Sequence, residues 1–303
     1  MQIYLAYILV VLIWSTTPLA IQWSSDSVSF IASVTLRMSL ALAVALAVLV
    51  WLRRGALFTR PGVWKVYLVA SLGIFPNMPL VYWSAQFVPS GLMAVIFALS
   101  PFVTGLLSMV ILRENPFNRL KVLALLIALV GLVIIFRGQL QVDVRSVYGI
   151  CGLLLSCVLF GTSSVTLKRL NEGTDAFRQT AGALLFSLPG LLLTWWWWDG
   201  EWPGPMSERA LWALIYLAVC GSVLGFTLFY YVLNHLSPSS VSLITLITPV
   251  LALFIGALVA KEQLTASLLV GTMLVIVALL VYLDLKRWLS LKLMLRWVRS
   301  ARK

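Results

Sequence analysis

Charged residues are scarce in this sequence of 303 residues: they make up 11% of the chain, whereas 61% of the residues are hydrophobic. A soluble globular protein carries roughly 25% charged residues. A chain this apolar lacks the polar side chains needed to cover a surface in water, so an ordinary soluble protein is excluded. Lipid is the expected solvent, and the length leaves room for about ten spanning helices of about 20 residues each and for no separate soluble domain.

Histidine and cysteine are almost absent as well, with one histidine and three cysteines. The single histidine, His235, excludes a histidine-rich metal centre, and the sequence contains no Cys-x-x-Cys pair, P-loop or Gly-x-Ser-x-Gly elbow. The sequence therefore predicts that the chain is not an enzyme and has no cofactor and no metal site. Cys151, Cys157 and Cys220 all lie in apolar stretches, which favours buried packing residues over a disulfide framework.

Apolar stretches separated by short gaps of Pro, Gly, Ser and charged residues run along the chain. Such stretches are expected to be helical, because a chain that crosses hydrocarbon must satisfy its own backbone hydrogen bonds. The expected fold is an all-α integral membrane protein with ten transmembrane helices, the first of them retained and not removed as a signal peptide. The predicted spans are 3–22, 29–52, 64–86, 90–112, 119–137, 148–168, 176–198, 210–233, 238–260 and 265–284.

The basic residues predict the orientation. With a cytoplasmic N-terminus, ten loop residues and seven tail residues of Lys or Arg lie on the inner side, seventeen in all, against four on the outer side. Because cytoplasmic loops carry an excess of Lys and Arg, both termini are expected in the cytoplasm of a bacterial-type inner membrane. The net charge of +12 lies in these gaps and in the tail, which predicts contact with the lipid bilayer and not with nucleic acid.

Three features are expected at the membrane surface. The basic tail 285–303 also contains Leu, Met and Trp, and is either an amphipathic helix on the inner leaflet or a simple positive-inside anchor. The run from Trp195 to Trp198 is interpreted as part of the outer aromatic belt, with a substrate gate as the alternative. His235 is either an interfacial residue or a group that titrates near neutral pH.

The fourth and ninth segments are similar to each other. Each opens with Pro-Ser, carries a proline in the middle (Pro101 and Pro249) and closes on a basic–Glu pair (Glu114 and Glu262). The interval from the middle proline to the glutamate is thirteen residues in both copies, and a tyrosine lies seven residues before each opening proline. These matches indicate an internal repeat.

The polar stretch 14–17 of the first segment corresponds to 161–164 of the sixth. The ten segments thus divide into a first repeat over 1–140 and a second over 141–284, followed by the tail 285–303. Because five is odd, the second repeat enters the membrane inverted, and inverted repeats around a midplane site are a recurring transporter architecture. A duplicated packing unit without transport is the alternative.

This pattern resembles the EamA family of the drug/metabolite transporter superfamily over nearly the whole chain. The resemblance is carried by the prolines and glutamates of the fourth and ninth segments, by the small polar stretch after Trp14, and by Arg37. The family often has Trp-Gly where this chain has Trp14-Ser15. The resemblance implies ten helices in two inverted five-helix halves around a central cavity, alternating access, and export or exchange of amino acids, related metabolites or drugs.

Arg37 lies seven residues past Phe30, roughly 10 Å into the second segment at about 1.5 Å per residue. A charge this deep in a hydrocarbon core about 30 Å thick normally faces the bundle interior and marks a functional site. We interpret Arg37 as a group that attracts a substrate carboxylate. The alternative is an arginine that is satisfied by helix-end carbonyls or that snorkels outward.

The ten acidic residues all lie in loops or near the ends of the predicted segments, and none is placed in the middle of one. Small multidrug transporters that exchange protons for cations rely on such a carboxylate. We therefore expect zwitterions or anions to be better substrates than organic cations.

Polar and aromatic residues inside the apolar segments are candidates for the cavity, because polar groups that face hydrocarbon are costly. With Arg37, the candidate cavity residues are Trp14, Ser15, Thr16, Thr17, Asn77, Tyr82, Trp83, Thr162, Ser163, Gln179, Tyr230, Tyr231 and Asn234. Prolines that kink helices and glutamates that close them are candidate gates and hinges, with helix capping as the alternative for the glutamates. This second group is Pro18, Pro101, Pro249, Glu114 and Glu262.

Together these features predict a carrier that moves a small molecule across the inner membrane, most simply an exporter. Without an ATP-binding motif, uphill movement would draw on an ion gradient or on substrate exchange. A non-transporting scaffold and a channel-like pore remain as alternatives, although no ring of charges indicates a pore. The sequence leaves the oligomeric state open, and a monomer is compatible with this interpretation.

The predicted topology can be tested with reporter fusions. An alkaline phosphatase fused at either terminus is expected to stay inactive, and a fluorescent protein that folds only in the cytoplasm is expected to fluoresce at both, because an even number of spans returns the chain to the side from which it starts. Opposite results at the two termini would contradict the division into two five-segment halves.

Overall fold

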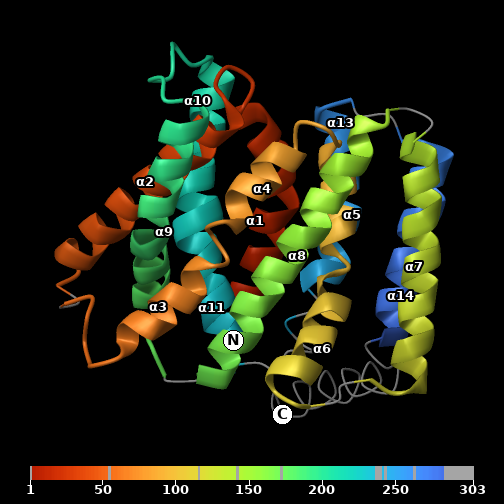
Figure 1. The fold of residues 1–303 in the computed structure, drawn as a ribbon, viewed down its shortest axis with the longest axis horizontal. Coiled ribbons are helices and arrows are strands. Elements are labelled where there is room, and N and C mark those ends of the chain that lie inside the picture. Colours follow the sequence, from red (N-terminus) through yellow and green to blue (C-terminus); the bar gives the residue numbers. More distant parts are fainter. Residues whose placement is uncertain are drawn as a thin grey trace, which may run out of the picture.

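The computed structural model describes residues 2–53, 56–114, 117–140, 143–170, 173–235, 241, 244–261 and 264–282. Within these ranges the regular secondary structure is helical and contains no strand (Figure 1). The elements are α1 (Gln2–Ser24), α2 (Phe30–Trp51), α3 (Val63–Ser71), α4 (Asn77–Ser84), α5 (Ser90–Phe97), α6 (Ser100–Ile111), α7 (Arg119–Leu140), α8 (Arg145–Leu170), α9 (Ala176–Trp198), α10 (Glu208–Tyr216), η1 (Leu217–Leu224), α11 (Gly225–His235), α13 (Ile244–Val259) and α14 (Ala266–Tyr282). The all-α prediction is confirmed.

Six helical stretches in the described part of the chain are long and apolar enough to cross a membrane. They are Gln2–Ser24, Phe30–Trp51, Ser90–Ile111, Arg145–Leu170, Ala176–Trp198 and Glu208–His235. Large apolar side chains such as Val50, Val110 and Trp197 are exposed on the outside of the bundle, where lipid rather than water is the expected neighbour. The chain is therefore a multi-spanning membrane protein.

The predicted spans 64–86 and 90–112 are each divided into two helices. The first of these segments is interrupted by turns at residues 72–76, and Pro76 is the N-cap of α4. The second is interrupted at Ala98 and Leu99, and Pro101 lies in the first turn of α6. Proline has no backbone N–H to donate and clashes with the preceding turn, so both breaks lie where the sequence removes a helical hydrogen bond.

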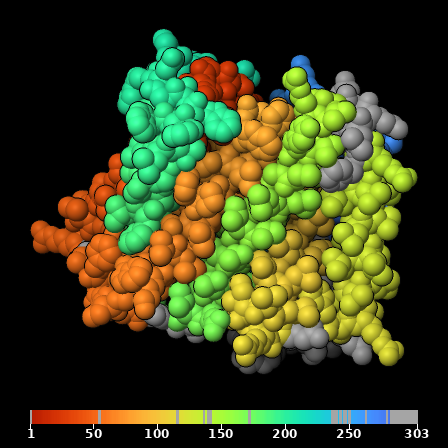
Figure 2. Space-filling model, in the orientation of Figure 1, coloured from red at the N-terminus to blue at the C-terminus, as the bar shows by residue number. Residues whose placement is uncertain are grey.

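Helices far apart in the sequence pack against each other. Helix α1 contacts α5, α10, α11 and α13, while α8 contacts α3, α4 and α6. Helix α2 lies against α9 and η1, and α7 lies beside α14 at one edge of the bundle (Figure 1). Figure 2 shows one face of this packing, where the segment of α3 and α4 (orange) lies against α8 (green).

Glycine allows α7 and α14 to approach at the level of the backbone. A Cβ on Gly131 would lie 2.8 Å from the carbonyl oxygen of Gly271, and a Cβ on Gly271 would lie 2.7 Å from the carbonyl oxygen of Gly131. No side chain fits at either position without a shift of the helices. In lipid, where the hydrophobic effect does not drive helices together, such close packing of small residues is the main source of association.

Substitution of Gly271 by alanine is therefore expected to destabilise the protein by about 1–3 kcal/mol, the usual cost of overpacking a tight contact. Thermal unfolding of purified protein in detergent measures this change. The control is Gly204→Ala, because a Cβ on Gly204 meets no atom within 4 Å. Equal unfolding midpoints for the two variants would show that the backbone contact does not hold α7 and α14 together.

Candidate functional site

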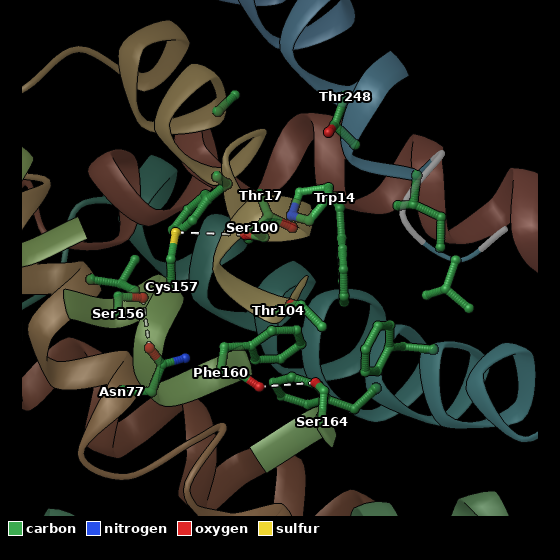
Figure 3. A pocket seen from close by; sticks show the side chains of 18 of the residues that line it. Trp14, Thr17, Asn77, Ser100, Thr104, Ser156, Cys157, Phe160, Ser164 and Thr248 are labelled. Atoms are coloured by element: carbon green, nitrogen blue, oxygen red, sulfur yellow. Dashed lines mark hydrogen bonds between the residues drawn. The ribbon is translucent and has the colours of Figure 1, made fainter. Parts of the chain in front are cut away.

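A cavity of about 240 Å³ lies where helices from both ends of the chain converge. Its walls come from α1, α2, α4, α5, α6, α7, α8, η1, α11 and α13, so most helices of the bundle contribute to it. Figure 3 shows the side chains that point into it. Its polar and charged lining residues are Thr17, Arg37, Asn77, Ser100, Thr104, Ser108, Lys121, Ser156, Cys157, Ser164 and Thr248.

Aromatic rings form one wall of the cavity. Trp14 of α1 packs against Phe229 of α11 with ring centroids 5.0 Å apart, and against Phe160 of α8 at 6.0 Å. Phe160 and Phe229 are themselves 5.2 Å apart. Because each ring comes from a different helix, the cluster gives the cavity a broad apolar wall that suits a ligand with an apolar body.

Arg37 is the charged group of the cavity that is buried in the bundle, with 1% of its surface exposed. Its Nε donates a hydrogen bond to the Ser222 hydroxyl at 2.9 Å, and its Nη1 donates to the Tyr82 hydroxyl at 3.2 Å. The guanidinium carbon also lies 5.9 Å from the centroid of the Tyr82 ring. These acceptors are side chains of η1 and α4, so Arg37 neither snorkels outward nor relies on helix-end carbonyls.

The positive charge of Arg37 has no acidic partner in the cavity. None of the described residues that line it is Asp or Glu. A guanidinium has five N–H donors, and the Ser222 and Tyr82 bonds use two of them. A buried charge without a counter-ion is costly, so an anion in the cavity would gain both charge compensation and the remaining donors.

A cluster of polar side chains from three helices lies in another wall, as Figure 3 shows. The Ser156 hydroxyl of α8 donates to the Asn77 amide oxygen of α4 at 2.6 Å, and Asn77 donates to the Gly73 carbonyl at 2.9 Å. The Ser100 hydroxyl of α6 lies 3.5 Å from the Cys157 sulfur. Since these groups bond to one another, they offer a ligand neutral polar contacts and no charge.

Several lining hydroxyls donate their protons to their own helices. Thr17 donates to the Ile13 carbonyl at 2.8 Å, and Ser164 donates to the Phe160 carbonyl at 2.9 Å. Ser108 does the same towards the carbonyl four residues before it. A hydroxyl that has donated its proton still has lone pairs, so these oxygens can accept hydrogen bonds from N–H or O–H groups of a ligand.

The cavity lining contains six of the residues predicted from the sequence. These are Trp14, Thr17, Pro18, Arg37, Asn77 and Pro101. Tyr82 is fully buried outside the lining and accepts a hydrogen bond from Arg37, which is part of the lining.

The other candidate cavity residues lie outside the lining. Ser15 and Thr162 donate to carbonyls of their own helices, and Ser163 donates to the Val69 carbonyl of α3. Thr16 shares a 2.6 Å hydrogen bond with Tyr216. Polar groups in these positions are satisfied within the bundle and join or stiffen helices.

Four further candidates lie away from the cavity, and one forms part of another pocket. Gln179 and Tyr230 are buried, Tyr231 packs against the His235 ring, and Asn234 is exposed. Trp83 lines a separate pocket with Phe30 and Trp198.

Two of the remaining candidate gates, Pro249 and Glu114, lie in the described part of the chain, and Glu262 does not. Pro249 lies within α13, whereas Glu262 lies outside the described residues, as does the tail 285–303. Glu114 is exposed just after α6, and within the described ranges no basic side chain forms an ion pair with it. Its role as a gate stays a prediction.

The sequence interpretation missed Ser156, Phe160, Ser100 and Ser222. A periodic signal was present for the first two, since 156, 160 and 164 are four residues apart and lie on one face of α8. Ser222 had no such signal, because it bonds to a residue 185 positions away.

Comparison with known proteins finds similarity to transporters. The model of the EamA-like transporter family matches residues 1–137 and again 147–283. The chain is 26% identical over 276 residues to an uncharacterized transporter, YoaV, of Bacillus subtilis, with 90% of this chain and 94% of YoaV covered. It is 23% identical over 223 residues to the protein PecM of Dickeya dadantii, with 73% and 74% covered.

One solved crystal structure has a similar fold. It superposes with a TM-score of 0.70 and 20% sequence identity, over 95% of this chain and 98% of the other. At this identity the similarity concerns the fold alone.

If Arg37 is present for a ligand and not for stability, its removal should not destabilise the protein. We expect Arg37→Met to leave the free energy of unfolding unchanged or to raise it by about 1 kcal/mol or more, because a buried charge is replaced by an apolar side chain of similar length. Thermal unfolding in detergent measures this, with the exposed Lys65→Met as the control. Marked destabilisation of the Arg37 variant alone would assign it a structural role.

Proposed function

We propose that this chain, which belongs to the EamA-like transporter family, carries small metabolites with a carboxylate and an apolar body across the inner membrane. Membership of the family and the six membrane-length apolar helices establish a membrane transporter. The substrate class, the alternating-access mechanism and outward transport are our proposal. Arg37, buried in the cavity without an acidic partner, is the observation that carries it.

The cavity supports this class of substrate in three ways. Its cations are Arg37 and Lys121, and its described lining contains no carboxylate, so it favours an anionic group. The rings of Trp14, Phe160 and Phe229 favour an apolar body beside that group. Its volume of about 240 Å³ lies just below the range of about 300–1,000 Å³ for ligand pockets, which suits a small metabolite better than a large drug.

Amino acids fit this description as well as simple carboxylic acids do. The ammonium group of an amino acid needs hydrogen-bond acceptors, and the oxygens of Thr17 and Ser164 can provide them. An organic cation without a carboxylate would instead meet Arg37 and no counter-ion. We therefore expect zwitterions and anions to be transported and organic cations to be excluded.

Helix packing supports the proposal of ten spans in two inverted halves. If the halves are related, α2 corresponds to α9 and α7 to α14, and each of these pairs is in contact. The contact of α1 with α13 has its counterpart in α8 with α6, and that of α1 with α11 has its counterpart in α8 with α4. The two matches of the family model, to 1–137 and to 147–283, also agree with repeats over 1–140 and 141–284.

Contacts between two connecting loops support alternating access. Asp26, after α1, forms a 3.4 Å ion pair with Arg209 of α10, and the Ser27 hydroxyl accepts a hydrogen bond from the Ser207 backbone N–H at 3.0 Å. Ser29 bonds to Asp199. In the predicted orientation these loops are extracellular, so their release would open the outer side of the cavity.

Counterflow in proteoliposomes tests the proposed function. Liposomes that contain the purified protein are loaded with L-leucine, L-phenylalanine or benzoate, and uptake of the same labelled compound is measured. Ethidium is tested in the same way as an organic cation. We expect saturable counterflow for one or more of the carboxylates and none for ethidium. Flux that does not saturate would indicate a channel, and silence with every compound would favour a scaffold; either result overturns the proposal.

The role of Arg37 is tested in the same assay. Arg37→Met is expected to abolish counterflow of the carboxylates, and Arg37→Lys to lower it, because an ammonium cannot form the bidentate pair that a guanidinium forms with a carboxylate. Lys65→Met, which removes an exposed cation, is the matched control and should transport normally. Full activity of Arg37→Met would separate the transport function from this arginine.

A further inference from the structure

The segment η1 is unusual because it is π-helical and lies in the middle of a membrane-length helix, between α10 and α11. In the described part of the chain no other segment has this geometry. A π-helix bonds each N–H to the carbonyl five residues back, so it holds an additional residue compared with an α-helix. Such segments are rare, and they are frequent at functional sites.

One side of η1 contacts Arg37. Ser222 is fully buried and accepts the hydrogen bond from Nε of Arg37, while its own hydroxyl lies 3.7 Å from the Met38 sulfur. Gly221 lines the cavity, and a Cβ at this position would lie 3.2 Å from Nη2 of Arg37. The π-helical turn thus supplies an acceptor for one end of the guanidinium and leaves space for the other end.

The C-terminal end of η1 contacts the aromatic wall. A Cβ on Gly225, which follows η1, would lie 3.3 Å from Nε1 of Trp14 and 3.2 Å from the carbonyl oxygen of Cys220. Trp14 in turn packs on Phe229 of α11. A single irregular segment therefore fixes both the charged wall and the aromatic wall of the cavity.

We propose that η1 is a positioning element for anion binding, in which Ser222 and Gly221 hold the guanidinium of Arg37 so that its free donors face the cavity. The proposal rests on the proposed function, since it assumes that Arg37 binds a substrate carboxylate. With Nε engaged by Ser222 and one N–H of Nη1 engaged by Tyr82, the second N–H of Nη1 and both N–H groups of Nη2 remain for a carboxylate. Ser222 lies outside the lining and thereby determines specificity without contacting the substrate.

The extra residue of a π-helix can be removed without turning the helices on either side. Deletion of one residue inside η1 lets the segment close into a regular α-helix, and α10 and α11 keep the faces that they bury. Ser222 and Gly221 would then rotate away from Arg37. Val219 is the suitable residue to delete, because it is 40% exposed on the lipid side of η1 and makes no contact with the cavity.

The experiment compares equilibrium binding of carboxylates with that of their amides. The protein in detergent is titrated with L-leucine, L-phenylalanine and benzoate and, in separate titrations, with leucinamide, phenylalaninamide and benzamide. The titrations use the wild type and the variants Ser222→Ala, Gly221→Ala and the Val219 deletion. We expect each variant to raise the Kd of the carboxylates about tenfold, as for the loss of one hydrogen bond involving a charged group, and to change the Kd of the amides less than about twofold. Ser222→Thr keeps the hydroxyl and should restore the preference.

Two controls separate positioning from stability. Ser187→Ala removes another buried serine hydroxyl, one that bonds within α9 and lies outside the cavity, and should bind as the wild type does. Deletion of the exposed Leu193 from the regular helix α9 should lower the unfolding midpoint, because the deletion rotates one part of that helix relative to the other and so changes which residues are buried. If the Val219 deletion does not fold, the Kd values of Ser222→Ala and Gly221→Ala decide whether η1 positions Arg37.

The outcomes distinguish this inference from the proposed function. If the wild type prefers carboxylates and the variants show the same ratio of Kd values, the positioning role of η1 is wrong while the transport proposal stands. If the wild-type protein binds amides as tightly as carboxylates, or binds none of the six compounds, Arg37 does not select carboxylates and both proposals fail. A selective loss of carboxylate affinity in Ser222→Ala supports the inference.

Discussion

A guanidinium buried in a helix bundle needs hydrogen-bond acceptors, and Arg37 finds them on two other elements of the fold. Tyr82 of α4 and Ser222 of η1 accept its hydrogen bonds, so α2, α4 and η1 are joined at one point. Because neither acceptor is charged, the bundle satisfies the polarity of Arg37 but not its charge. The positive character of this part of the cavity follows from this arrangement.

The surrounding bundle must hold that charge inside a membrane. In lipid, helices associate through close packing, and this chain uses glycine where backbones meet, as at Gly131 and Gly271. Irregular backbone inside a membrane is tolerated where it lies within the protein or lines a cavity. The break between α5 and α6 follows this rule, because Ser100 and Pro101 directly after it line the cavity.

Membership of a transporter family explains the architecture but not the substrate. YoaV and PecM are 26% and 23% identical to this chain over the aligned residues, which leaves individual cavity positions free to differ. Function depends on the groups placed in the site rather than on the fold that carries them. For this chain we propose that those groups are Arg37, the aromatic wall of Trp14, Phe160 and Phe229, and the neutral polar cluster around Asn77.

The sequence alone determined that the chain lies in a membrane, is helical, and carries an arginine at a depth where charge is costly, because these properties depend on composition and on local spacing. It also indicated Trp14, Asn77 and Pro101, since polar residues and prolines stand out in apolar segments. Only the tertiary structure decided that Ser15 and Ser163 bond within the bundle and that Ser222 holds Arg37 from 185 positions away. The direction in which a side chain points depends on how helices pack and where they break, and a linear pattern does not contain that information.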